Sequence, residues 1–291
     1  MMPAYHIGTL TKEARRALSE AAGETGQSGA PRDVFLNSRS WSKGTLHAKE
    51  TVSWDTKVLT FALDHEQQSL GLPIGQHLMM RVRDSATGEA VIRSYTPISH
   101  QTRAGFVDVL VKVYYDSRER KGGKMSQALD ALPLGQAVDF KGPVGKFEYL
   151  GRGECTVGAQ VRRVRTLVMI CGGSGITPIY QVYRAIMEDR EDPTKVVVLN
   201  GNRLFEDILC REELDRLATG NEDRCKILYT LTQGTDEWKG LRGRINGPLL
   251  QEHAPCEADS MVLICGPEAM EKACHEALQK QGWQAEDLFS F

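Results

Sequence analysis

The hydrophobic pattern of the chain changes once, near residue 165, and this change limits what the chain can fold into. Between residues 41 and 149, apolar and polar residues alternate in short runs at 57–63, 77–82 and 106–115. Beyond residue 165 the apolar runs are continuous, at 166–170, 195–199, 226–231 and 261–264. Alternation is typical of half-exposed antiparallel strands, whereas continuous runs are typical of strands buried on both faces. The sequence therefore predicts two domains of different architecture.

The first domain is predicted to be an antiparallel barrel or sandwich, because only residues 125–132 have helical spacing there. In the second, strands alternate with helical segments at about 207–217 and 268–281, which predicts a parallel sheet with helices on both faces. A length of 291 residues accommodates both. The predicted fold class is α+β, with domains at 41–150 and 166–291. Residues 151–165, rich in glycine and arginine without a clear period, are predicted to connect them.

The N-terminal part of the chain is predicted to be a linker. Residues 19–31 are small and polar, without periodicity, and residues 12–18 form at most a short helix. The folded part is expected to start near Phe35, and residues 1–40 are assigned to the linker.

Composition excludes several classes of function. The formal net charge of −2 gives no basic field for nucleic acid or an anionic membrane surface. No apolar run approaches the roughly 18 residues of a membrane helix. The seven cysteines form no C-x-x-C pair and the histidines are scattered, which argues against a disulfide framework and a metal site. These features favour a reducing, cytoplasmic location.

A glycine run follows the first continuous strand. Residues 171–178 read Cys-Gly-Gly-Ser-Gly-Ile-Thr-Pro, and helical spacing begins directly after them. Such a turn lets backbone amides and a helix N-terminus approach a phosphate. Pro178 stands where the common dinucleotide fingerprint has its third glycine, so this is not the usual dehydrogenase loop. A nucleotide contact and a plain tight turn both fit the pattern.

Three further motifs have a chemical and a structural reading. Residues 93–99 read Arg-Ser-Tyr-Thr-Pro-Ile-Ser, in which an arginine fork suits a pyrophosphate; the alternative is a surface arginine beside a core tyrosine. Residues 122–127 read Gly-Gly-Lys-Met-Ser-Gln, a second anion site or a simple helix start. Cys265-Gly-Pro ends an apolar strand at the edge where ligands bind, although a lone cysteine there is more often packing.

Taken in order, the four motifs resemble the ferredoxin-reductase-like flavoprotein family, in its cytochrome b5 reductase branch. The resemblance covers about residues 41–291. It implies a six-stranded barrel that binds FAD, followed by a domain that binds NADH or NADPH. It also implies hydride transfer from the nicotinamide nucleotide to FAD.

The resemblance assigns roles residue by residue. Thr96, Lys112 and Cys265 would be the catalytic group, with Cys265 orienting the nicotinamide without acting as a nucleophile. The residues that would bind the cofactors are Arg93, Ser94, Tyr95, Thr96, Val111, Val113, Tyr115, Gly123, Lys124, Met125, Ser126, Gly173, Gly175, Thr177, Pro178, Cys265, Gly266, Pro267 and Met270. No residue is assigned to a metal.

Other segments, at 3–9, 142–153 and 207–215, are similar to the eukaryotic assimilatory nitrate reductases. This implies a reductase fragment that passes single electrons to a b5-type haem domain during nitrate assimilation. The haem and molybdopterin domains would be absent from this chain, and dimerisation would occur through them. Lys43, Lys49 and Lys57 are candidate contacts for the haem domain.

Three alternatives remain at this point: a free-standing NADH-cytochrome b5 reductase, a flavin reductase that feeds an oxygenase, and a nucleotide-sensing module without activity. The coenzyme is also open, because Arg203 suits the 2′-phosphate of NADPH whereas Glu206 or Asp207 would repel it. The sequence pattern favours NADH.

Overall fold

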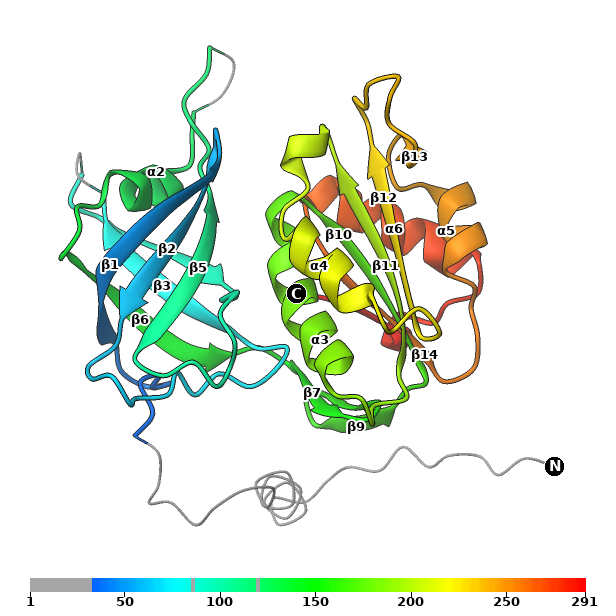
Figure 1. Cartoon of the computed structure of the whole chain (residues 1–291), viewed down its shortest axis with the longest axis horizontal. Coiled ribbons are helices and arrows are strands. Elements are labelled where there is room, and N and C mark those ends of the chain that lie inside the picture. The colour runs from blue at the N-terminus through cyan, green and yellow to red at the C-terminus, as the bar shows by residue number, and fades with distance from the viewer. Residues whose placement is uncertain (1–32, 85–86, 119–120) are drawn as a thin grey trace.

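The computed structural model describes residues 33–84, 87–118 and 121–291. The predicted linker at 19–31, the short helix at 12–18 and the segment at 3–9 lie outside them. Figure 1 shows two units side by side, a strongly curved sheet and a sheet flanked by helices. The strands are β1 (Ser42–Ser53), β2 (Thr56–Ala62), β3 (His77–Arg83), β4 (Ala90–Tyr95), β5 (Phe106–Lys112), β6 (Ala137–Val144), β7 (Phe147–Gly151), β8 (Glu154–Val157), β9 (Gln160–Arg163), β10 (Thr166–Gly172), β11 (Lys195–Asn202), β12 (Cys225–Leu231), β13 (Leu241–Arg242), β14 (Ser260–Cys265) and β15 (Leu288–Ser290). The helices are α2 (Lys124–Ala131), α3 (Ile176–Glu188), α4 (Arg211–Ala218), α5 (Gly247–His253) and α6 (Glu268–Lys280).

The first unit is a six-stranded antiparallel sheet with the strand order β4-β3-β6-β1-β2-β5, as the sequence predicts. Its core holds alternate residues of β2, β3, β5 and β6, as expected for a sheet with one exposed face. Phe140 is fully buried there and packs edge-on against Phe35 and Phe61. Because Phe35 belongs to this core, the barrel begins at the predicted start of the folded part, inside the stretch assigned to the linker.

The connection between the units is more ordered than its sequence suggests. Strands β7, β8 and β9 form a separate three-stranded antiparallel sheet, where irregular chain is predicted at 151–165. Four glycines with positive φ, Gly145, Gly151, Gly153 and Gly158, hide the strand periodicity. Phe147 and Tyr149 of this sheet pack into the core of the second unit. At the end of the chain, Phe291 packs on Phe147, with ring centroids 5.8 Å apart.

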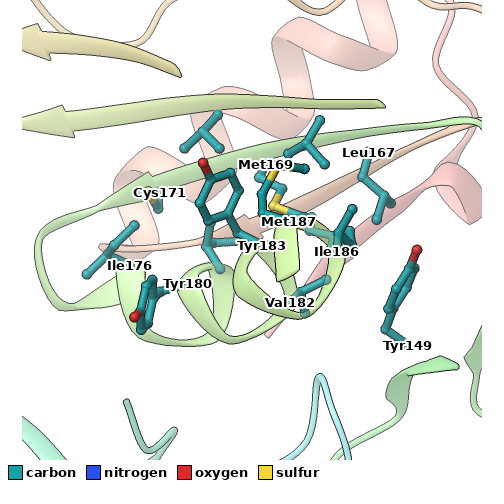
Figure 2. Packing of buried hydrophobic residues seen from close by; sticks show 14 of the residues in the cluster. Tyr149, Leu167, Met169, Cys171, Ile176, Tyr180, Val182, Tyr183, Ile186 and Met187 are labelled. Atoms are coloured by element: carbon teal, nitrogen blue, oxygen red, sulfur yellow. The ribbon is translucent and has the colours of Figure 1, made fainter. Parts of the chain in front are cut away.

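The second unit is a parallel sheet with the order β13-β12-β11-β10-β14-β15. Two hydrophobic clusters, one on each face, confirm the prediction of a doubly covered sheet. Helices α3 and α4 cover one face, and α5 and α6 cover the other (Figure 1). Figure 2 shows how α3 presents Val182, Tyr183 and Ile186 to Leu167 and Met169 of β10.

Among the helices predicted in the described residues, one begins at a different residue, and α5 (Gly247–His253) was not predicted. The helix predicted from residue 207 begins at Arg211, because Cys210 has a φ of 55° and so cannot be helical. Residues Phe205–Asp207 form a separate 3-10 turn, in which the Asp207 carboxylate accepts the Leu204 amide at 3.1 Å. The acidic residues at this position therefore lie in the loop after β11, at the carboxyl edge of the sheet.

The sequence argues against a membrane-spanning helix and against a disulfide framework, and the described residues bear on both. No helix among them is long and apolar enough to cross a membrane. The seven cysteines are all free in the structure.

We expect Phe140→Ala to lower the free energy of unfolding by about 3–5 kcal/mol, because it leaves a cavity beside the rings of Phe35 and Phe61. Urea unfolding followed by circular dichroism measures the change. Leu134→Ala is the matched control: Leu134 is 64% exposed, so its loss should change stability by no more than about 0.5 kcal/mol. Equal effects of the two substitutions would contradict the assignment of Phe140 to the core.

Candidate active site

The motif at 93–99 lies on β4, at the edge of the barrel sheet, and continues into the loop that follows. Arg93 and Ser94 are exposed, and Arg93 donates a hydrogen bond to the Ile92 carbonyl at 2.7 Å. Tyr95 is partly buried and Thr96 is 7% exposed. Burial raises the pKa of Tyr95 to about 12, so its hydroxyl remains a hydrogen-bond donor at neutral pH. The strand thus offers a cation outside and a phenol and a hydroxyl nearer the core.

Helix α2 begins directly beside this motif, because it packs against β3, β4 and β5. Its N-cap is Gly123, and no side chain caps the helix, which leaves first-turn amides for an anion. A Cβ on Gly122 would lie 2.3 Å from the Tyr114 carbonyl, so the close approach of chain here requires glycine. The motifs that would hold one cofactor therefore lie together.

Two side chains of the α2 motif already have partners. The Ser126 hydroxyl accepts the Tyr114 amide and donates to the Gly123 carbonyl, both at 3.1 Å. It thus fastens the end of β5 to the start of α2, and its contact with a phosphate stays a prediction. Lys124 is 57% exposed and pairs with Asp84 at 2.8 Å. Met125 is buried in the barrel core.

Strand β5 separates its residues into two faces. Val111 and Val113 are buried in the barrel core, so only their main chain is left to face a cofactor. Lys112 points the other way and pairs with Asp55 at 2.8 Å and with Asp207 of the second unit at 3.2 Å. Burial opposes its charge, but these two carboxylates hold the pKa of Lys112 above its usual value. Lys112 is therefore a cation at neutral pH, shared between the two units.

The lysine contacts proposed for a haem domain differ in availability. Lys43 is exposed on β1. Lys49 donates to the Leu132 carbonyl at 3.0 Å, and Lys57 pairs with Asp130, which also accepts the Tyr115 hydroxyl at 3.0 Å. Lys49 and Lys57 thus hold α2 on the barrel.

In the second unit, the glycine run forms a 3-10 turn, Gly173–Gly175, between β10 and α3. Gly173 has a φ of 55°, and an added Cβ would meet nothing within 4 Å, so its outer side is open. A Cβ on Gly175 would lie 2.2 Å from the Cys265 carbonyl. Thr177, 8% exposed, donates to the Ser174 carbonyl at 3.2 Å and closes the turn. Pro178 is buried in the first turn of α3.

Cys265 lies at the end of β14, directly beside the glycine turn. Burial, with a smaller effect of Glu271, raises the pKa of its thiol to about 12. A neutral thiol is a poor nucleophile, in agreement with an orienting role. Gly266 donates its amide to Glu271 at 2.9 Å, and a Cβ on it would lie 2.4 Å from the Met270 methyl carbon. The carboxyl edge of the sheet is thus closely packed where a nucleotide would pass.

The two halves of the site meet through β5. This strand lies against the glycine turn, and its Leu110 side chain packs in the core cluster that also holds Ile176. Sequence reasoning missed three residues at the join. Asp55 pairs with Lys112, and Gln181 and Arg184 of α3 are hydrogen-bonded to the barrel at Gly75 and Ile98. Their partners are far away in the sequence, so no local pattern reveals them.

The donors present fit both cofactors expected from the sequence. An exposed arginine on an edge strand beside an uncapped helix start suits a pyrophosphate, and a glycine cradle at a strand end suits a nucleotide. Among the described residues no group of histidine, cysteine, aspartate and glutamate side chains could hold a metal ion.

Comparison with protein families and known proteins identifies both units. An oxidoreductase FAD-binding domain family matches residues 43–149, and an oxidoreductase NAD-binding domain family matches residues 169–276. The nitrate reductase [NADPH] of Leptosphaeria maculans is 55% identical over 293 aligned residues and that of Aspergillus niger is 54% identical over 291. Each alignment includes the whole chain but 33% of the relative, so the chain spans about a third of these proteins.

A solved structure has the same fold over nearly the whole described chain. The cytochrome b5 reductase domain of Ulva prolifera nitrate reductase is 36% identical, with a TM-score of 0.84. The match covers 90% of this chain and 100% of that domain. The matched families also confirm that FAD and a nicotinamide nucleotide are the cofactors of this architecture.

We expect Arg93→Ala to weaken FAD binding by about ten- to a hundredfold, because a charge-assisted hydrogen bond contributes roughly 1.5–3 kcal/mol. Flavin retained after dialysis measures the loss. Arg83→Ala is the control, since the Arg83 guanidinium donates to the Gly88 carbonyl in the turn that precedes β4, outside the motif. Full retention of flavin by the Arg93 variant would remove this residue from the site.

We expect Cys265→Ser to slow flavin reduction more than it weakens nucleotide binding, because the residue orients the nicotinamide. Stopped-flow reduction and equilibrium titration separate the two quantities. Since the thiol pKa of about 12 keeps it protonated, the wild-type rate should show no thiol titration in the neutral range. An unchanged rate in the variant would assign Cys265 to packing alone.

Proposed function

The chain belongs to the FAD- and NAD-binding oxidoreductases of the cytochrome b5 reductase type, and we propose that it carries electrons from NADPH through FAD to a b5-type haem. The observation that carries the proposal is the convergence of the barrel motifs and the glycine turn on β5. The acceptor would be the haem domain expected from the sequence motifs, within a nitrate reductase, which is the name that the relatives carry. The cytoplasm is the proposed location.

Bound FAD and nicotinamide nucleotide would supply the chemistry, which is hydride transfer followed by release of single electrons. The protein binds and orients. Arg93 and the first-turn amides of α2 would hold the pyrophosphate of FAD, and Tyr95 and Thr96 would lie beside its ring and ribityl chain. Thr177 and Cys265 would place the nicotinamide, with Lys112 as the cation between the units. Correct placement of two bound reactants lowers the barrier substantially without any covalent step on the protein.

The choice of NADPH departs from the preference for NADH in the sequence pattern. Asp207, which would repel a 2′-phosphate, is only partly exposed, and its two oxygens are taken up by the Leu204 amide and by Lys112. Arg203 is exposed, and its hydrogen bond to Gln233 is long, 3.4 Å. Arg203 is thus more available than Asp207, while Glu206 in the same loop is exposed. The relatives from Leptosphaeria maculans and Aspergillus niger carry NADPH in their names.

A purified chain tests the proposal directly. It should show flavin absorption that NADPH bleaches under anaerobic conditions, and it should then reduce ferricyanide and a separately produced b5-type haem domain. Absence of flavin would contradict the cofactor assignment, and bleaching without haem reduction would contradict the acceptor.

We expect Arg203→Ala to raise the KM for NADPH by about tenfold or more and to leave the KM for NADH nearly unchanged, since only NADPH offers the phosphate. Steady-state assays with ferricyanide measure both constants. Arg190→Ala, which changes an arginine in the loop after α3, is the control. A parallel rise for both nucleotides would mean that Arg203 does not read the 2′-phosphate.

A further inference from the structure

Helix α3 lies between the two units, and one of its faces is hydrogen-bonded to the barrel. Gln181 accepts the Gly75 amide at 2.7 Å. One turn later, Arg184 donates to the carbonyls of Ile98 and Ser99 at 2.8 and 2.7 Å. Glu188 accepts from the His100 ring at 2.9 Å. Residues three and seven positions apart share a helix face, so these contacts form one row.

Arg184 is the unusual member of this row. It is 7% exposed, and its charge meets two carbonyl dipoles and the ring of Tyr180, whose centroid is 5.1 Å away. A buried charge is costly unless its hydrogen bonds are well made. The planar guanidinium fork fixes both acceptors in one geometry, which the single ammonium of lysine does not do.

The contact of Arg184 with Ile98 and Ser99 links the flavin motif to the helix that follows the glycine turn. Ile98 follows Thr96 by two residues, in the motif assigned to the flavin. Helix α3 begins at Ile176, directly after the glycine turn assigned to the nicotinamide nucleotide. A shift of α3 along the barrel therefore moves the glycine turn relative to the flavin motif.

We propose that Arg184 is a positioning residue that sets the distance between nicotinamide and flavin by clamping the end of the flavin motif, Ile98 and Ser99, to α3. The proposal rests on the hydride transfer proposed above. Arg184 contacts none of the side chains assigned to a cofactor, and it acts through the main-chain carbonyls of Ile98 and Ser99 at the end of the flavin motif. Its loss should therefore slow hydride transfer while both cofactors still bind.

Arg224 provides a matched control. It also donates to main-chain carbonyls, those of Ile186, Met187, Asp189 and Asp192. All of these partners lie in the second unit, so Arg224 ties that unit together without reaching the barrel. Its substitution should cost stability but leave the arrangement of the two units unchanged.

The test compares Arg184→Lys, Arg184→Met and Arg224→Lys with the wild type, all with FAD bound. Anaerobic stopped-flow reduction by NADPH gives the limiting rate and the nucleotide affinity, and flavin content and midpoint potential are measured beside them. A misplacement of about 1 Å costs roughly a hundredfold in rate. We expect both Arg184 variants to lose about ten- to a hundredfold in limiting rate, with affinity, flavin content and potential nearly unchanged. Arg224→Lys should keep the wild-type rate.

Several outcomes would overturn the proposal. One is a wild-type limiting rate of flavin reduction in Arg184→Met. Another is a wild-type limiting rate in Arg184→Lys, which would mean that the positive charge alone is enough. The third is a fall in rate that is explained by a changed midpoint potential of the flavin. If Arg184→Met does not fold, Gln181→Leu, which removes the neighbouring bond to Gly75, should show a smaller fall of the same kind. Failure of NADPH to reduce the wild-type flavin would contradict the proposed function instead, so the two failures are distinguishable.

Discussion

Helix α3 must satisfy two surfaces at once, and the arrangement of the whole molecule depends on this constraint. Its apolar face packs on the sheet of the second unit, with Val182, Tyr183 and Ile186 fully buried. Its polar face is bonded to loops of the barrel. Rotation about the helix axis would expose apolar surface and break hydrogen bonds together. Each unit therefore fixes the orientation of the helix for the other.

The join between the units combines an apolar contact, Leu110 of β5 in the cluster that holds Ile176, with ion pairs and hydrogen bonds. Lys112 sits between Asp55 of its own unit and Asp207 of the other, and Arg184 meets carbonyls. Polar contacts of this kind are directional, so they specify one relative placement more sharply than an apolar patch of similar size. A nucleotide that enters along the carboxyl edge would meet charged groups that are already ordered.

Periodicity was sufficient to predict most of the fold. The change near residue 165 correctly separated an antiparallel unit from a parallel one. Strands buried on one face alternate apolar and polar residues, whereas strands buried on both faces are continuously apolar. It failed at β7 to β9, where glycines of positive φ interrupt the pattern, and at Cys210, whose φ of 55° no pattern reveals. The local motifs of the candidate site are visible in the sequence, and the roles assigned to them stay predictions. Asp55, Gln181 and Arg184 were missed, because each functions through a partner far along the chain.

The order of strands along the chain has a consequence for synthesis on the ribosome. All six strands of the barrel lie between Ser42 and Val144, so that sheet has every partner it needs once this stretch has emerged. The parallel sheet differs, since its edge strand β15 follows all of its other strands in sequence and pairs with β14. The barrel can therefore form before the strands of the second sheet have been synthesised. FAD would then meet a finished half-site before the nucleotide half exists.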